Sequence, residues 1–329
     1  MSSLVRYVTV QDGVVSRHAM GGGASMGVDY YLAIGPAGVL RWLGALDEDY
    51  DGDDGWADDG LCRDAVLLDA DRRRLLFHTG LDPFGCDGAY AARAALLDGY
   101  SRTWPGWTIE WAYHGTGDLV TALGEDRSVV READPFRTEL YPYGRGEPDD
   151  PVRYVVSVVD ETGCRRYALN AWSEQPWRLG PESLLAALPA EEPVTACRTM
   201  PKAGLHLDLR TRRAGLWSIE ILRGLADWWP QRWPDWEFEF WADDPAPHLA
   251  RAGKLTLPPV DMDLAVRELA HRLDKHWPVE EIWRKREVDV DRLYRMNFSG
   301  IRAHLDARVT PAELDTAVNA ILDGRPLYA

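Results

Sequence analysis

The first stretch whose residue types could do chemistry is an acidic run at residues 47–58. Asp47, Asp49 and Asp51 alternate and Gly52 follows, as in the first half of a calcium-binding loop. Alternating carboxylates can fold around a hard cation, and the glycine allows a sharp turn. Position twelve, however, is Asp58 rather than the usual long glutamate. A solvated acidic loop is therefore preferred, with a calcium site at Asp47, Asp49, Asp51 and Asp58 as the alternative; no other cofactor is expected.

Tryptophans close to acidic residues are a second candidate for binding. Trp228 and Trp229 stand near Trp233, which is more indole than one helix face can bury. Core packing is the favoured interpretation. Aromatic residues in an acidic setting are nevertheless typical of protein-binding hot spots. The functional interpretation predicts that a partner is bound by Trp228, Trp229 and Trp233, together with Asp53, Asp54 and Trp56 of the acidic run.

The histidines and cysteines form no catalytic motif. The eight histidines include no helical pair beside a glutamate, as a zinc protease would need, and Gly-x-Ser-x-Gly does not occur. The four cysteines are far apart without Cys-x-x-Cys, so reduced thiols are expected. No catalytic residue is assigned. An enzyme would have to use residues near strand ends, namely His78, Asp82, His114 and His206.

A sequence duplication must position these candidates. Trp104–Trp111 reads WPGWTIEW and Trp233–Phe240 reads WPDWEFEF. In both, a helical pattern ends at Trp-Pro, because proline disfavours helical geometry in the residue before it. An alternating strand pattern follows. Upstream, each copy opens with Val-Arg-Tyr-Val, a hairpin signal and a Gly-Pro that begins a short helix.

Each copy is thus predicted to be a ββαββαβ unit. The fold class is α+β: a tandem duplication in a pseudo-twofold arrangement, with a C-terminal helical appendix that could cover the second unit. The predicted boundaries are the first repeat at 1–131, a linker rich in Pro, Gly and Asp at 132–151, the second repeat at 152–253, and the helical segment at 254–329.

The helices that matter most for the fold can be given bounds from sequence. The main helices of the two copies are expected at about 89–103 and 219–232, where apolar residues recur at helical spacing. In the appendix, a helix is expected at 311–322, with Thr310 as its N-cap and proline in the first turn.

The charge is strongly negative and unevenly distributed. The formal net charge is −16; residues 254–329 carry 12 basic and 13 acidic side chains, which leaves 25 basic and 40 acidic ones in 1–253. Such a surface repels nucleic acid and anionic membranes and attracts a basic partner. The sequence shows neither a signal-peptide pattern nor an apolar run of membrane-spanning length, so a cytoplasmic location is expected.

In broad style the chain resembles the acidic α+β proteins that neutralise toxins or serve as accessories in bacterial conflict systems. Its Ala-, Arg-, Asp- and Trp-rich texture is typical of high-GC actinobacteria. No motif of a particular family carries the resemblance. The prediction is a non-enzymatic protein that captures a basic protein partner, as an immunity protein, inhibitor or accessory. The alternative is an enzyme or small-molecule-binding protein with its site in the cleft between the repeats.

Overall fold

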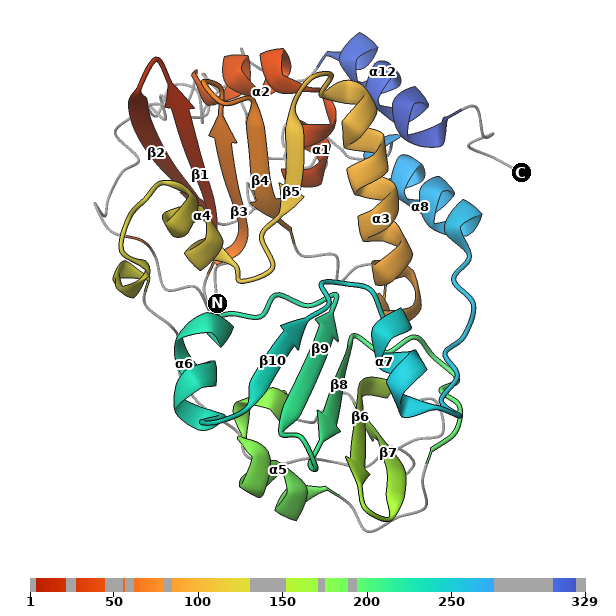
Figure 1. Ribbon diagram of the computed structural model, residues 1–329. Coiled ribbons are helices and arrows are strands. Elements are labelled where there is room, and N and C mark those ends of the chain that lie inside the picture. The colour runs from red at the N-terminus through yellow and green to blue at the C-terminus, as the bar shows by residue number, and fades with distance from the viewer. Residues whose placement is uncertain are drawn as a thin grey trace. The chain divides into compact units, whose positions relative to one another are not determined.

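The computed structural model describes residues 4–21, 28–44, 56, 62–79, 85–130, 152–170, 175–188, 194–274 and 310–323 (Figure 1). The chain divides into two compact units. One comprises Met1–Gly80, Ala92–Ala133 and Met262–Ala329, and the other comprises Leu81–Ala91 and Asp134–Asp261. Each unit contains one five-stranded mixed sheet with helices, which confirms the α+β class and the duplication. The pseudo-twofold arrangement stays a prediction.

The first sheet has the strand order β2-β1-β3-β4-β5. Its strands are β1 (Leu4–Gln11), β2 (Val14–Gly21), β3 (Cys62–Asp69), β4 (Arg74–His78) and β5 (Thr108–Trp111). The helices of this unit are α1 (Val28–Ala33), α2 (Pro36–Leu43), α3 (Gly85–Thr103) from Ala92 onward, α4 (Thr116–Ala122), the 3-10 turn η4 (Arg127–Val129), α8 (Met262–Asp274) and α12 (Pro311–Leu322). None of the described helices of the chain is long and apolar enough to cross a membrane.

The second sheet has the equivalent order β7-β6-β8-β9-β10. Its strands are β6 (Val152–Asp160), β7 (Gly163–Asn170), β8 (Ala203–Asp208), β9 (Arg213–Ser218) and β10 (Glu237–Phe240). The accompanying helices are η5 (Pro176–Arg178), α5 (Pro181–Ala187), α6 (Leu225–Arg232) and α7 (Ala246–Ala252). In both sheets the successive pairings alternate between antiparallel and parallel.

The registers show how the two copies correspond. Val10 pairs with Asp69 beside the hairpin turns of the first sheet, and Val159 pairs with Asp208 at the same place in the second. The Val-Arg-Tyr-Val segments predict a different alignment of β1 with β6. When the two copies are aligned on the observed pairs instead, the residues of β6 that match β1 lie two positions further along the chain. The difference arises because β6 is one residue longer and its pairing with β7 shifts register near its start.

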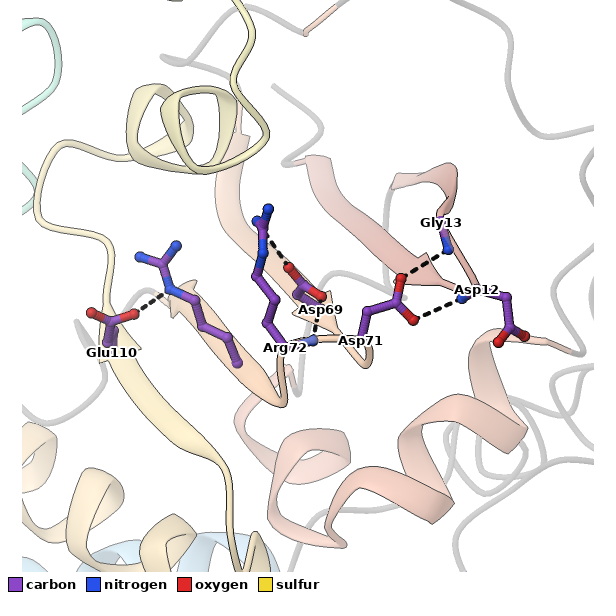
Figure 2. Close-up of polar contacts among 7 residues, drawn as sticks. Asp12, Gly13, Asp69, Asp71, Arg72 and Glu110 are labelled. Carbon is purple, nitrogen blue, oxygen red and sulfur yellow. Dashed lines mark hydrogen bonds and ion pairs between the residues drawn. The ribbon is translucent and has the colours of Figure 1, made fainter.

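Side-chain contacts tie the hairpin turns of the first sheet together (Figure 2). Asp12 and Gly13 both have positive φ, as the turn between β1 and β2 requires. Their backbone N–H groups donate to the two carboxylate oxygens of Asp71, at 2.8 Å each. Next to them, Asp69 accepts a hydrogen bond from the backbone N–H of Arg72 at 2.9 Å. The carboxylate of Asp71 thus joins the β1–β2 turn to the β3–β4 turn.

The predicted main helices differ in length from the observed ones. In the first copy α3 begins at Gly85, ahead of the expected start. In the second copy α6 begins only at Leu225, because Gly224 has a left-handed backbone (φ 66°) and interrupts the helix predicted from residue 219. Both helices end at Trp-Pro, as predicted.

The C-terminal helices belong to the first unit. Helix α12 begins as predicted, with Thr310 and Glu313 forming a capping box. It packs against α8 and α1, and Arg102 of α3 donates to the carbonyl oxygen of Ala320 at 2.7 Å. The apolar faces of α8 and α12 thus complete the helical layer of the first unit. That the appendix could cover the second unit stays a prediction.

Candidate functional site

The three tryptophans predicted to bind a partner lie in the core of the second unit. Trp228, Trp229 and Trp233 are 6%, 6% and 1% exposed and belong to one core cluster. The rings of Trp229 and Trp233 stack with centroids 4.5 Å apart, and Trp229 also packs against Phe238. The structure thus agrees with the core-packing interpretation and leaves little indole surface for a partner.

Of the acidic run at residues 47–58, the structure describes only Trp56. Trp56 is 7% exposed, and its Nε1 donates to Oε2 of Glu125 at 2.8 Å. The remaining predicted residues of the run lie outside the described residues, as does one catalytic candidate: Asp47, Asp49, Asp51, Asp53, Asp54, Asp58 and Asp82. Within the described part of the chain, no three His, Cys, Asp or Glu side chains form a metal-binding group.

The three histidine candidates fall in two different units. His78 is buried at the end of β4, and His114 follows β5, where its backbone N–H donates to Asp118. His206 lies in the second unit, inside β8 rather than at its start. These residues therefore do not meet in one site within either unit. His206, however, belongs to a buried polar cluster with residues that the sequence did not suggest.

This cluster joins Ser157 of β6, His206 of β8, Trp217 of β9 and His248 of α7. The hydroxyl oxygen of Ser157 is 2.8 Å from His206 Nδ1 and 2.8 Å from His248 Nε2. Trp217 Nε1 donates to His248 Nδ1 at 3.1 Å. All four side chains are at most 6% exposed. We call these four residues the Ser–His cluster.

The indole N–H fixes the direction of every hydrogen bond in the Ser–His cluster. Because Trp217 donates to Nδ1 of His248, a neutral His248 carries its proton on Nε2 and donates to Ser157. The Ser157 hydroxyl must then donate to Nδ1 of His206, which leaves the proton of a neutral His206 on Nε2. All the donors and acceptors between these groups are matched, so the cluster is a satisfied chain of hydrogen bonds rather than a set of orphaned polar groups.

Burial keeps both imidazoles neutral. The pKa of His206 is lowered to about 4, mainly by burial and then by the charge of Arg251, against the opposing effect of Asp208 and Glu239. The pKa of His248 is lowered to about 3, again mainly by burial, with smaller effects from His206 and Arg251. Neutral rings are what the directional chain of hydrogen bonds requires.

The corresponding positions of the first copy are apolar. From the aligned registers, Ser157 corresponds to Val8 and its strand partner His206 corresponds to Leu67. Val8 and Leu67 are buried in a core cluster with Leu119 of α4. The fold itself therefore accepts apolar side chains at these two positions. The polar cluster is a feature of the second copy alone.

Two strand glycines make room for the Ser–His cluster. A Cβ atom on Gly204 would lie 2.2 Å from Trp217 Nε1 and 2.4 Å from His248 Nδ1. A Cβ atom on Gly215 would lie 1.9 Å from the ring of Trp241, which packs beside His248. The first copy carries larger residues at the corresponding positions, Ala65 and Leu76.

The chemistry open to this cluster is limited by access. Ser157 is 0% exposed and His248 is 1% exposed, so neither can meet a substrate in this conformation. A hydroxyl between two histidines could in principle be activated as a nucleophile. Here the Ser157 hydroxyl instead joins β6 to β8 and α7 through its hydrogen bonds to His206 and His248. Comparing the two copies in the correct register could have identified it, since polar residues stand where the first copy is apolar.

Comparisons with known proteins give no relative from which a function could be carried over. Searches against protein-family models, curated proteins and solved structures each produced no significant match.

Proposed function

We propose that this chain is a non-enzymatic acidic protein that captures a basic protein partner, as an immunity protein, an inhibitor or an accessory of a bacterial conflict system. The observation that carries the proposal is the surplus of carboxylates: 53 Asp and Glu against 37 Lys and Arg. Clustered charge of one sign raises the rate at which an oppositely charged protein associates.

The ion pairs within each unit sharpen this argument. Many described arginines already contact a carboxylate of their own unit, so their charges build no extended positive surface for an acidic macromolecule. Such pairs are Arg17–Glu125, Arg41–Glu313, Arg74–Glu110, Arg153–Glu220, Arg213–Glu237 and Arg251–Glu239. Each pair removes one charge of either sign, so the net charge of −16 persists in full.

Edge strand β10 is the described surface best suited to such a partner. It is the last strand in the order of the second sheet and pairs there with β9. Glu237 and Glu239 alternate with the half-buried Phe238 and Phe240, which combines acidic and aromatic groups on one strand. Exposed ion pairs contribute little, so basic side chains of a partner could replace Arg213 as the neighbour of Glu237.

The test begins with affinity capture by the full chain from a lysate of its own host at low salt. A basic protein bound in a fixed ratio would then be purified, and its association rate measured at several salt concentrations. The proposal expects a rate that falls steeply with added salt, because screening weakens long-range attraction. Capture of no basic protein at low salt would contradict it.

A matched pair of variants locates the contact. Glu237→Gln with Glu239→Gln removes two negative charges from β10, and Glu161→Gln with Glu182→Gln removes two elsewhere in the same unit. We expect the β10 variant to slow association and also to speed dissociation, whereas the control only slows association slightly. Equal effects from both variants would remove β10 as the contact surface while leaving the charge argument intact.

A further inference from the structure

Arg6 is a buried cation near the start of β1. Its side chain is 2% exposed and lies on the same sheet face as Val8, since side chains alternate along a strand. Its Nε and Nη1 atoms are buried and have no hydrogen-bond acceptor among the described residues. The guanidinium lies over the ring of Trp56, with 5.9 Å between its central carbon and the ring centroid.

A second arginine shares this tryptophan but has a partner of its own. The guanidinium of Arg17 lies 5.7 Å from the centroid of the Trp56 ring and forms an ion pair with Glu125. Glu125 also accepts the hydrogen bond from Trp56 Nε1. The described group therefore holds two guanidinium ions and one carboxylate. It lacks one negative charge.

Two guanidinium ions with one carboxylate are unfavourable in a buried place unless a further negative charge balances them. A guanidinium keeps its charge inside proteins, and arginines are rarely buried without a partner. The cation–π contact with Trp56 offsets only part of the lost hydration.

The second copy shows that the sheet does not need this arginine. By the aligned registers, Arg6 pairs with Ala65, and its counterpart Val155 pairs with Gly204. Val155 is buried among apolar residues. Arg6 is thus specific to the first copy, as the Ser–His cluster is specific to the second.

We propose that Arg6, together with Arg17 and Trp56, forms a binding site for a small oxyanion, a carboxylate or phosphate group, in the first unit. The anion supplies the missing negative charge and accepts hydrogen bonds from the unsatisfied nitrogens of Arg6. Oxygen acceptors of this kind suit a guanidinium best, because charge-assisted hydrogen bonds are the strongest that it forms. Glu125 does not compete, since Arg17 and Trp56 already occupy it.

The test compares the full chain with Arg6→Val, the residue type that the second copy carries. Inorganic phosphate and acetate are titrated in turn at constant ionic strength, with chloride as the reference anion. Melting temperature and the Nε–Hε signals of arginine in a ¹H–¹⁵N spectrum are recorded. Phosphate stabilises proteins in general, so the difference between wild type and variant is the measured quantity. Arg210→Met, which removes an exposed arginine of the second unit, is the control for lost charge.

We expect an oxyanion to raise the melting temperature of the wild type and of Arg210→Met, and to shift one protected arginine signal. In Arg6→Val that signal is absent and the affinity falls by about tenfold or more, as loss of charge-assisted hydrogen bonds implies. A response to phosphate but not acetate identifies a phosphate site, and the reverse identifies a carboxylate site. Equal responses in wild type and Arg6→Val overturn the proposal. No anion response together with a large loss of stability in Arg6→Val also overturns it, because the partner of Arg6 would then lie within the chain itself.

Discussion

The indole Nε1 of Trp104 donates a hydrogen bond to the carbonyl oxygen of Leu32 at 2.7 Å, and this contact joins the two most recognisable motifs of the repeat. Trp104 is the tryptophan of the Trp-Pro motif that follows α3. Leu32 lies three residues before the glycine of the Gly-Pro motif that begins α2. In the second copy, Trp233 Nε1 donates to the carbonyl oxygen of Trp177 at 2.6 Å, at the same distance from its Gly-Pro. The duplication has kept this contact although the residues at the carbonyl differ.

Replacing either tryptophan by phenylalanine removes the donor and some buried volume. We expect the free energy of unfolding to fall by about 2–3 kcal/mol in each case. Trp233→Phe should be the more severe, because the carbonyl of Leu32 also accepts from the backbone N–H of Gly35. Chemical denaturation followed by circular dichroism measures both. Trp107→Phe, at a half-buried position, should cost less than about 1 kcal/mol.

The glycines of the Gly-Pro motifs permit a close backbone approach. Gly35 has φ 84°, and a Cβ atom there would lie 2.5 Å from the carbonyl oxygen of Thr103. Gly124 has nearly the same φ, but a Cβ atom there would meet nothing within 4 Å. Gly124→Ala should therefore cost only the backbone strain of about 1–2 kcal/mol. Gly35→Ala should cost clearly more, and similar unfolding midpoints for the two variants would show that the close approach relaxes at no cost.

The Ser–His cluster should make the second unit sensitive to acid. Both histidine pKa values lie below the ordinary 6.5, at about 4 for His206 and about 3 for His248. The unfolded chain therefore binds more protons than the folded one below pH 6.5, and stability falls as pH decreases from there towards 4. The full contribution of His206 is about 3 kcal/mol, and it is present above its unfolded pKa.

His206→Asn isolates this effect, since the amide keeps an acceptor for Ser157 without a titrating ring. Between pH 6 and pH 4 the variant should lose stability less steeply than the wild type, by up to about 1.4 kcal/mol per pH unit. Unfolding curves at a series of pH values give the slope. Parallel slopes would mean that His206 is charged in the folded protein, contrary to the directions of the hydrogen bonds in the Ser–His cluster.

Gly99 allows α12 to pack closely on α3. A Cβ atom at Gly99 would lie 2.5 Å from Cγ1 of Ile321. Gly99→Ala should weaken the docking of α12, costing about 1–3 kcal/mol and exposing the C-terminal segment to proteases. Adding Ile321→Ala should recover part of the loss, because the smaller side chain makes room. If the double variant is as unstable as the sum of the two single ones, the two residues do not interact in this way.

The duplicated architecture could be predicted because its signals are local. Proline disfavours helical geometry in the residue before it and is tolerated at the first helical position, so Trp104-Pro105, Trp233-Pro234 and the two Gly-Pro motifs placed elements correctly. Trp-Pro alone is not sufficient, because Trp229-Pro230 lies inside α6. The capping box at Thr310 similarly placed α12. The predicted helix at 219–232 is too long because its apolar pattern continues through Gly224, whose left-handed backbone no periodicity reveals.

The candidate site was harder to predict because its residues meet only through strand register and the packing of α7 on the sheet. Ser157, His206 and His248 are separated by 49 and by 91 positions along the chain, counting from Ser157. Nothing in their sequence spacing brings them together. Likewise, the tryptophans near residue 230 seemed too many for one helix face. A single face of α6 did not have to bury them, because Trp229 and Trp233 stack on each other and pack with β10 and the η5 segment.

The composition of the first unit from segments at both ends of the chain has a consequence for biosynthesis. Its helix α12 is synthesised after the whole of the second unit, which consists almost entirely of one continuous stretch, Asp134–Asp261. A nascent chain can therefore fold the second unit before the C-terminal helices of the first unit have been synthesised. The usual order, in which the N-terminal part folds first, is therefore reversed. A chain truncated before α12 would contain a folded second unit and an incomplete first unit.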